Sequence, residues 1–137
     1  MTLLQIFFLV ALFGSVGLAL SIGGREERFA AIVIMAATLG TPVAQYQGFV
    51  GIEAGILLID VLLLLALGWL ALTSRSFWPL WATGFQLGAL VVHITAGSAP
   101  DILPAAYAET LVIWSYPVLV SLGVGSWFEA RRRRQLR

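Results

Sequence analysis

The stretch from Gly51 to Leu72 constrains the fold more than any other part of the chain. It reads GIEAGILLIDVLLLLALGWLAL, 22 residues that carry only two charges, Glu53 and Asp60. A helix rises about 1.5 Å per residue, so this stretch can cross a hydrocarbon core of roughly 30 Å. It must be helical, because backbone groups find no water partners in lipid. A central aspartate costs about 2.5–3.5 kcal/mol on insertion scales, which indicates a partner or a function for Asp60.

The composition of the whole chain is also typical of an integral membrane protein. Of its 137 residues, 60% are hydrophobic and only 11% are charged, whereas soluble domains carry about 25% charged residues. There are no cysteines, which excludes disulfides and a cysteine nucleophile. All eight basic residues are arginine, and we interpret this, together with the abundance of Ala and Leu, as the mark of a GC-rich bacterial genome.

Five apolar segments predict an all-α bundle of five transmembrane helices. We expect one transmembrane domain over residues 1–128, with spans at about 3–22, 29–45, 51–72, 79–96 and 105–128, and a basic cytoplasmic tail at 129–137. The first segment lacks the basic start of a signal peptide, so we expect it to remain uncleaved. The second contains Thr38, Gly40, Thr41 and Pro42, so the alternative is four spans plus one re-entrant or interfacial segment.

The arginines predict the orientation of the bundle. With five spans, every arginine falls in the turn after the first span, the turn after the third, or the C-terminal tail. The positive-inside rule then places the N-terminus outside and the C-terminus in the cytoplasm, in the bacterial inner membrane. We interpret the tail residues as topology anchors, with attraction to anionic lipid or to a cytoplasmic partner as the alternative; they are Arg131, Arg132, Arg133, Arg134 and Arg137. The aromatic residues near this side predict an interfacial belt, and they include Trp69, Phe77, Trp78 and Trp81.

Polar residues on the third and fourth spans predict a ladder between them. Glu53 and Asp60 are seven residues apart, and so are Gln86 and His93 on the next, antiparallel span, so each pair lies on one helix face. Comparing depths at 1.5 Å per residue pairs Glu53 with His93 and Asp60 with Gln86. At a depth similar to that of Asp60, the fifth span offers three further donors, Trp114, Ser115 and Tyr116.

Four interpretations of this ladder are open. The favoured one is interhelical hydrogen bonding that fixes helix register, with a neutral Asp60. The second is a proton or cation pathway, since acidic and histidine side chains inside membranes mark relays. The third is a metal site at Glu53 and His93, for which no clear third or fourth ligand is present. The fourth is a haem for which His93 would be one axial ligand and a dimer partner would supply the other.

Two glycine pairs fit the small-xxx-small motif of close helix packing, Gly51 with Gly55 and Gly84 with Gly88. We expect them to pack the third span against the fourth, with an oligomer face as the alternative.

No catalytic or nucleotide-binding motif is present, and the basic residues are not interleaved with aromatic ones as in a nucleic-acid surface. We therefore expect no enzyme activity, cofactor, metal or nucleic-acid partner. The expected function is that of an accessory or scaffold subunit, in a homo-oligomer or a larger membrane complex. The alternative is a small oligomeric transporter or proton-coupled channel that uses the ladder.

Overall fold

The structure, a computed structural model, describes residues 2–46, 52–98 and 104–137, and at 44–46, 52, 53, 96, 97, 104, 105, 107 and 108 only the backbone. The regular secondary structure in this part of the chain is all helical, as predicted, and its five helices are α1 (Leu3–Ser21), α2 (Arg25–Tyr46), α3 (Ile52–Thr73), α4 (Trp78–Ser98) and α5 (Pro104–Gln135).

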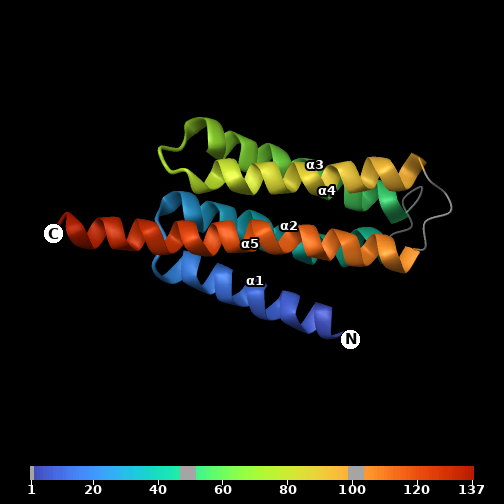
Figure 1. The fold of residues 1–137 in the computed structure, drawn as a ribbon, viewed down its shortest axis with the longest axis horizontal. Helices are drawn as coiled ribbons and strands as arrows, with labels where there is room; N and C mark the ends of the chain where they lie inside the picture. Colours follow the sequence, from blue (N-terminus) through green and yellow to red (C-terminus); the bar gives the residue numbers. More distant parts are fainter. Residues whose placement is uncertain (1, 47–51, 99–103) are drawn as a thin grey trace.

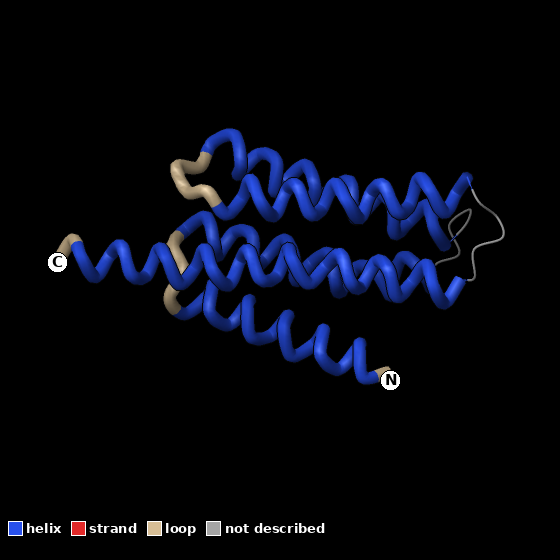
Figure 2. The backbone as a smooth tube through the Cα atoms, viewed as in Figure 1, coloured by secondary structure: helices blue, strands red, loops and turns tan. Residues whose placement is uncertain are grey.

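The five helices lie side by side along one axis (Figure 1). Each packs against its neighbours in sequence, and α5 also contacts α1 and α2, which closes the bundle. Successive helices run in opposite directions, so the turns at 22–24 and 74–77 and the end of α5 lie at one end of the bundle, opposite the N-terminus (Figure 2). All eight arginines therefore lie at this end, which we call the arginine end.

The charged residues after the first helix belong to α2, which begins at Arg25 rather than at the expected residue 29. A Glu27 carboxylate oxygen accepts the backbone N–H of Gly24 at 2.8 Å, which satisfies a donor at the helix start. Glu26 and Glu27 also lie at the positive end of the helix dipole. The preceding turn is tight, because a Cβ on Gly23 would lie 2.3 Å from the carbonyl oxygen of Ala19.

The basic tail is also helical, since α5 continues to Gln135 instead of ending near residue 128. Its 32 residues are about 48 Å long at 1.5 Å per residue, longer than a hydrocarbon core of about 30 Å. Glu129 forms ion pairs with Arg132 and Arg133 one turn further on. Arginine is a good helix former, and its charge suits the negative end of the helix dipole.

Among the residues that the structure describes, three helical segments are long and apolar enough to cross a membrane. They are Leu3–Ser21, Ala54–Thr73 and Glu109–Gln135. The described part of the chain is thus an all-helical fold with three candidate membrane spans, fewer than the five predicted. α2 and α4 have 22 and 21 residues. α2 starts with four charged residues, and the side chains described after them end at residue 43, which leaves a shorter apolar segment among the described residues. α4 contains Gln86 and His93.

The core is made of small and aliphatic side chains from all five helices, and large apolar side chains cover the outside. Alanines at the contacts, among them Ala19, Ala31 and Ala82, let the helices approach closely. The remaining large core residues are mainly leucines, such as Leu12, Leu67 and Leu122. Every helix also exposes large apolar residues, and on α2 and α4 these include Ile32, Leu39, Leu80, Val91 and Ile94.

Candidate functional site between α3 and α4

Asp60 is the polar centre of the contact between α3 and α4. Gln86 donates from Nε2 to one carboxylate oxygen of Asp60 at 3.1 Å. The other carboxylate oxygen lies 2.6 Å from Nε2 of His93. This contact is an ion pair when His93 is protonated and Asp60 is charged, and otherwise a hydrogen bond. One side chain of α3 therefore holds two residues that are two turns apart on α4.

The cluster is largely removed from the surroundings of the bundle. Gln86 and His93 are buried, whereas the Asp60 side chain keeps 22% of its surface exposed. Among the side chains that the structure describes, no buried nitrogen or oxygen lacks a hydrogen-bond partner. A polar group buried without a partner costs about 1–3 kcal/mol, so this pairing removes most of the cost of placing an aspartate between two apolar helices.

The predicted pairing of Asp60 with Gln86 is confirmed, and the His93 side chain adds a partner that the depth comparison did not predict. In an α-helix, side chains lean toward the N-terminus of the helix. On α4 this direction brings His93 down to the level of Asp60, although its Cα lies nearer the other end of the helix. The predicted rung between His93 and Glu53 lies outside the described residues, because the Glu53 side chain is among those not described.

Two of the three donors predicted on α5 donate to backbone carbonyls, and the third, Trp114, packs against α4. The Ser115 hydroxyl donates to the carbonyl of Leu111 at 3.0 Å. The Tyr116 hydroxyl donates to the carbonyl of Leu4 on α1 at 2.8 Å, and its ring meets Phe8 edge-on. The Trp114 ring lies so close to α4 that a Cβ on Gly88 would be 2.4 Å from it.

The glycine pair on α4 splits between two environments. Gly88 packs against Trp114 of α5, not against α3 as predicted. Gly84 has open space, because a Cβ there would meet nothing within 4 Å. Gly55 on α3 is half-buried, and Gly51 lies outside the described residues. The motif is therefore only partly a packing motif, and it acts on the α5 side of the helix.

The metal hypothesis gains no support from the described side chains, which contain no group of three or more histidine or acidic residues able to hold an ion. Asp60 and His93 form a pair, and the third member of the cluster is an amide.

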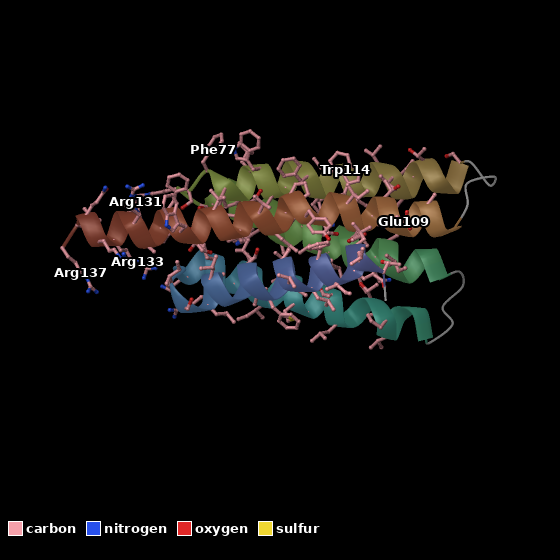
Figure 3. All side chains as sticks on the ribbon, turned by 60° about the horizontal axis from the view of Figure 1, so that its bottom comes forward. Phe77, Glu109, Trp114, Arg131, Arg133 and Arg137 are labelled. Atoms are coloured by element: carbon pink, nitrogen blue, oxygen red, sulfur yellow. The ribbon has the colours of Figure 1, made fainter. Side chains whose placement is uncertain are left out.

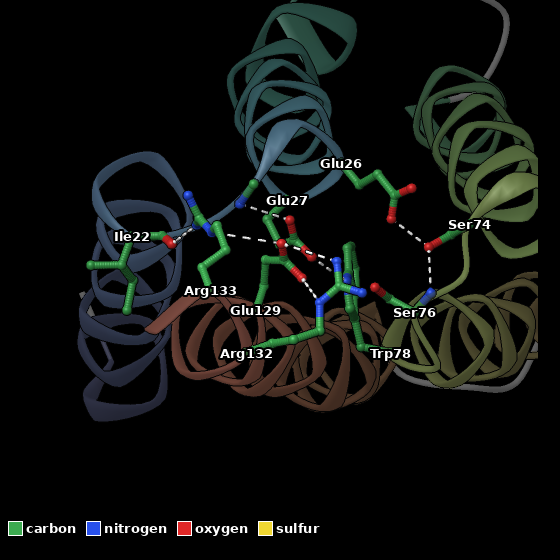
Figure 4. A network of polar contacts seen from close by, with 10 residues as sticks. Ile22, Glu26, Glu27, Ser74, Ser76, Trp78, Glu129, Arg132 and Arg133 are labelled. Carbon is green, nitrogen blue, oxygen red and sulfur yellow. Dashed lines mark hydrogen bonds and ion pairs between the residues drawn. The ribbon is translucent and has the colours of Figure 1, made fainter. Parts of the chain in front are cut away.

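A second polar network, at the arginine end, was not predicted from the sequence (Figure 4). Glu27 is 2% exposed, and its second carboxylate oxygen accepts the indole N–H of Trp78 at 2.9 Å. Beside it, the Ser74 hydroxyl donates to Glu26, which ties the turn between α3 and α4 to the start of α2. Trp78 is therefore a core residue rather than part of an interfacial belt, unlike the exposed Trp69, Phe77 and Trp81. An acid three residues after Gly24 is the one sequence signal that pointed to this network.

The arginines of α5 take different positions around this network (Figure 3). Arg132 and Arg133 pair with Glu129, and Arg133 also donates to the carbonyl of Ile22 at the end of α1. The guanidinium of Arg131 lies 5.1 Å from the centre of the Trp127 ring, and Arg134 and Arg137 are exposed.

Comparisons of the chain with models of protein families, with curated proteins and with solved structures gave no match.

Proposed function

We propose that all five helices cross a bacterial inner membrane, with the N-terminus outside and the C-terminus in the cytoplasm. The lower apolarity of α2 comes from charges in its first turn, at the arginine end. The polar residues of α4 turn toward Asp60 on α3. Both helices expose apolar side chains along their length, which lipid would cover. The positive-inside rule favours a cytoplasmic arginine end.

This orientation can be tested directly, because the chain has no cysteine of its own. Single cysteines at Thr2 and Ser76 would be labelled in intact cells with a maleimide that does not cross the membrane. Five spans predict labelling of T2C only, and labelling of S76C only after the cells are opened. Labelling of both T2C and S76C in intact cells would show that α1, α2 and α3 do not all cross, and labelling of S76C alone would reverse the proposed orientation.

We further propose that the protein is a non-enzymatic accessory or scaffold subunit of the membrane. The observation that carries this proposal is that both carboxylate oxygens of Asp60 bind α4. Such a contact fixes the register of α3 against α4. Two grooves on the described surface are apolar, and neither is lined by Asp60, Gln86 or His93. This arrangement favours a rigid membrane part that associates with itself or with a larger complex.

A proton-coupled transporter is the second candidate, and the contact between Asp60 and His93 is the observation that favours it. A carboxylate and an imidazole 2.6 Å apart can pass a proton between them. The 22% exposure of the Asp60 side chain leaves a side from which the proton could enter. A short bundle would need an oligomer to complete a pathway.

Flux in proteoliposomes separates the two candidates. The protein would be reconstituted as wild type, Asp60→Asn and Asp60→Leu, with Glu109→Gln as a control that removes an exposed carboxylate elsewhere. The scaffold proposal predicts no proton or cation flux above that of empty liposomes. It also predicts that Asp60→Asn keeps the native oligomer and that Asp60→Leu weakens it. Flux that is present in wild type and Glu109→Gln but lost in Asp60→Asn would overturn the scaffold proposal and establish Asp60 as a titrating site.

A further inference from the structure

Three aromatic side chains form a ladder at the start of α4 near the arginine end, with the first ring in the turn that precedes the helix. Phe77 and Trp81 have ring centres 6.0 Å apart, and Trp81 and Phe85 have ring centres 6.2 Å apart. Phe77 and Trp81 are 66% and 55% exposed. We call Phe77, Trp81 and Phe85 the aromatic ladder.

Two apolar grooves share this ladder as a wall. The larger, of about 600 Å³, runs along α5 and includes Pro117, Val120, Val124 and Phe128 in its lining. The smaller, of about 470 Å³, is lined on its other parts by Leu80, Gly84 and Trp114. Each volume lies within the roughly 300–1,000 Å³ of small-molecule sites. All three rings of the aromatic ladder therefore line both apolar grooves.

The grooves have rigid floors because tryptophans pack directly onto backbone. Trp78 covers Gly125 so closely that a Cβ there would lie 2.3 Å from its ring, and Glu27 holds the Trp78 indole N–H. Trp114 covers Gly88 in the same way, and Gly84 leaves the smaller groove unfilled. The floors are thus fixed by close contacts between a tryptophan ring and the backbone.

Arginines lie close in the chain to residues that line the grooves, at the arginine end. Arg75 lies two residues before Phe77, and Arg131 and Arg132 follow Phe128 by three and four residues, on the same helix face. Arg75 and Arg131 are exposed, and Figure 3 shows Arg131 and Phe77 toward the same end. A ligand with an apolar body in the grooves would therefore present its polar end to guanidinium groups.

We propose that this face binds one anionic phospholipid, with an acyl chain on each side of the aromatic ladder and the phosphate at Arg75 and Arg131. Guanidinium groups bind phosphate with paired hydrogen bonds. A partner helix fits less well, because it is about 10 Å wide and the exposed rings of the ladder would hold it off the groove floors. The proposal rests on insertion in a membrane, and only the choice of leaflet rests on the proposed orientation.

Native mass spectrometry of the delipidated protein in neutral detergent tests this proposal. The probes are phosphatidylglycerol, phosphatidylcholine with the same acyl chains, and lysophosphatidylglycerol, which has one chain. We expect phosphatidylglycerol to bind about tenfold or more tightly than phosphatidylcholine, since each basic residue near a lipid surface adds several-fold. Lysophosphatidylglycerol should bind more weakly than phosphatidylglycerol, because it fills one groove.

Two kinds of variant separate the headgroup from the chains. Arg75→Gln with Arg131→Gln should remove the preference for phosphatidylglycerol and leave phosphatidylcholine binding unchanged. Gly84→Leu fills the smaller groove from a position with open space, so it should fold normally and weaken both two-chain lipids about equally. Arg137→Gln, near the end of α5, and Val10→Trp, on the exposed face of α1, are the matched controls and should change neither. Circular dichroism and thermal melting verify that each variant is folded.

Three results would overturn the proposal. The first is equal binding of the two headgroups by wild type, which would mean ordinary boundary lipid. The second is unchanged lipid binding in Gly84→Leu. The third is a dimer that excludes lipid and is lost in Gly84→Leu, which would mean that a second copy covers the face. Because lipid binding is measured in detergent, its outcome is independent of proton flux and of orientation in cells.

Discussion

The two sides of α4 are held by different kinds of contact. Toward α3, Gln86 and His93 bind the Asp60 carboxylate. Toward α5, Gly88 receives the Trp114 ring, and Gly125 of α5 receives the Trp78 ring of α4. The first contact is polar and selects a register, whereas the second depends on shape and close approach.

This difference bears on how a small helical bundle is stabilised in lipid, where the hydrophobic effect does not favour association of the helices. Helices in lipid associate through van der Waals packing and interhelical hydrogen bonds. Hydrogen bonds there average only about 0.6 kcal/mol, because the separated helices also find partners. A tryptophan seated on a glycine makes many dispersion contacts at once. We therefore expect the α5 side of α4 to contribute more stability than the α3 side.

The largest effect is expected from adding a side chain to Gly88 or Gly125, the two glycines against which tryptophan rings pack. Gly88→Ala and Gly125→Ala would each place a Cβ within 2.4 Å of a tryptophan ring, and overpacking of this kind costs about 1–3 kcal/mol. The free energy of unfolding in mixed micelles, measured as the fraction of denaturing detergent rises, should fall by that amount. Gly84→Ala is the matched control on the same helix. It should be neutral or slightly stabilising, because it meets open space and alanine favours the helix. Equal losses for Gly84→Ala and Gly88→Ala would show that the ring contact is not what matters.

A loss of similar size is expected from Glu27→Ala, which removes the acceptor of both the Trp78 indole N–H and the Gly24 backbone N–H. Leaving a buried donor without a partner costs about 1–3 kcal/mol, so we expect a loss of about 2 kcal/mol in the same assay. Glu109→Ala, at an exposed position, should stay within about 0.5 kcal/mol of wild type. If Glu27→Ala also stays within that range, the hydrogen bond does not contribute to holding Trp78 in place.

The smallest effect is expected at the polar contact itself. A double-mutant cycle of Asp60→Ala and His93→Ala should give a coupling energy of about 0.6 kcal/mol, and no more than about 1.7 kcal/mol. A coupling energy above the loss caused by Gly88→Ala would reverse the comparison between the two sides of α4. A coupling energy of zero would mean that the contact adds no stability, which would strengthen the case for a proton-transfer role.

Sequence patterns predicted much of this arrangement. Long apolar segments predicted the helices, because a chain in lipid must satisfy its own backbone. The comparison of depths on antiparallel helices predicted the contact of Asp60 with Gln86, because the rise per residue of a helix is fixed. Helix ends were less well predicted: α2 starts and α5 ends in charged segments, where local capping and helix propensity outweigh polarity.

The sequence by itself determined that the chain is helical and apolar and that its arginines gather at one end, since these follow from local chemistry and chain direction. Only the tertiary structure decided which side chains meet. His93 joins Asp60 because its side chain leans along the helix, and Trp78 is buried because Gly125 and Glu27 lie opposite it. Gly84 and Gly88 belong to one sequence motif, yet one faces open space and the other a ring. Spacing along a helix fixes which residues share a face, but the neighbouring helix fixes what that face contacts.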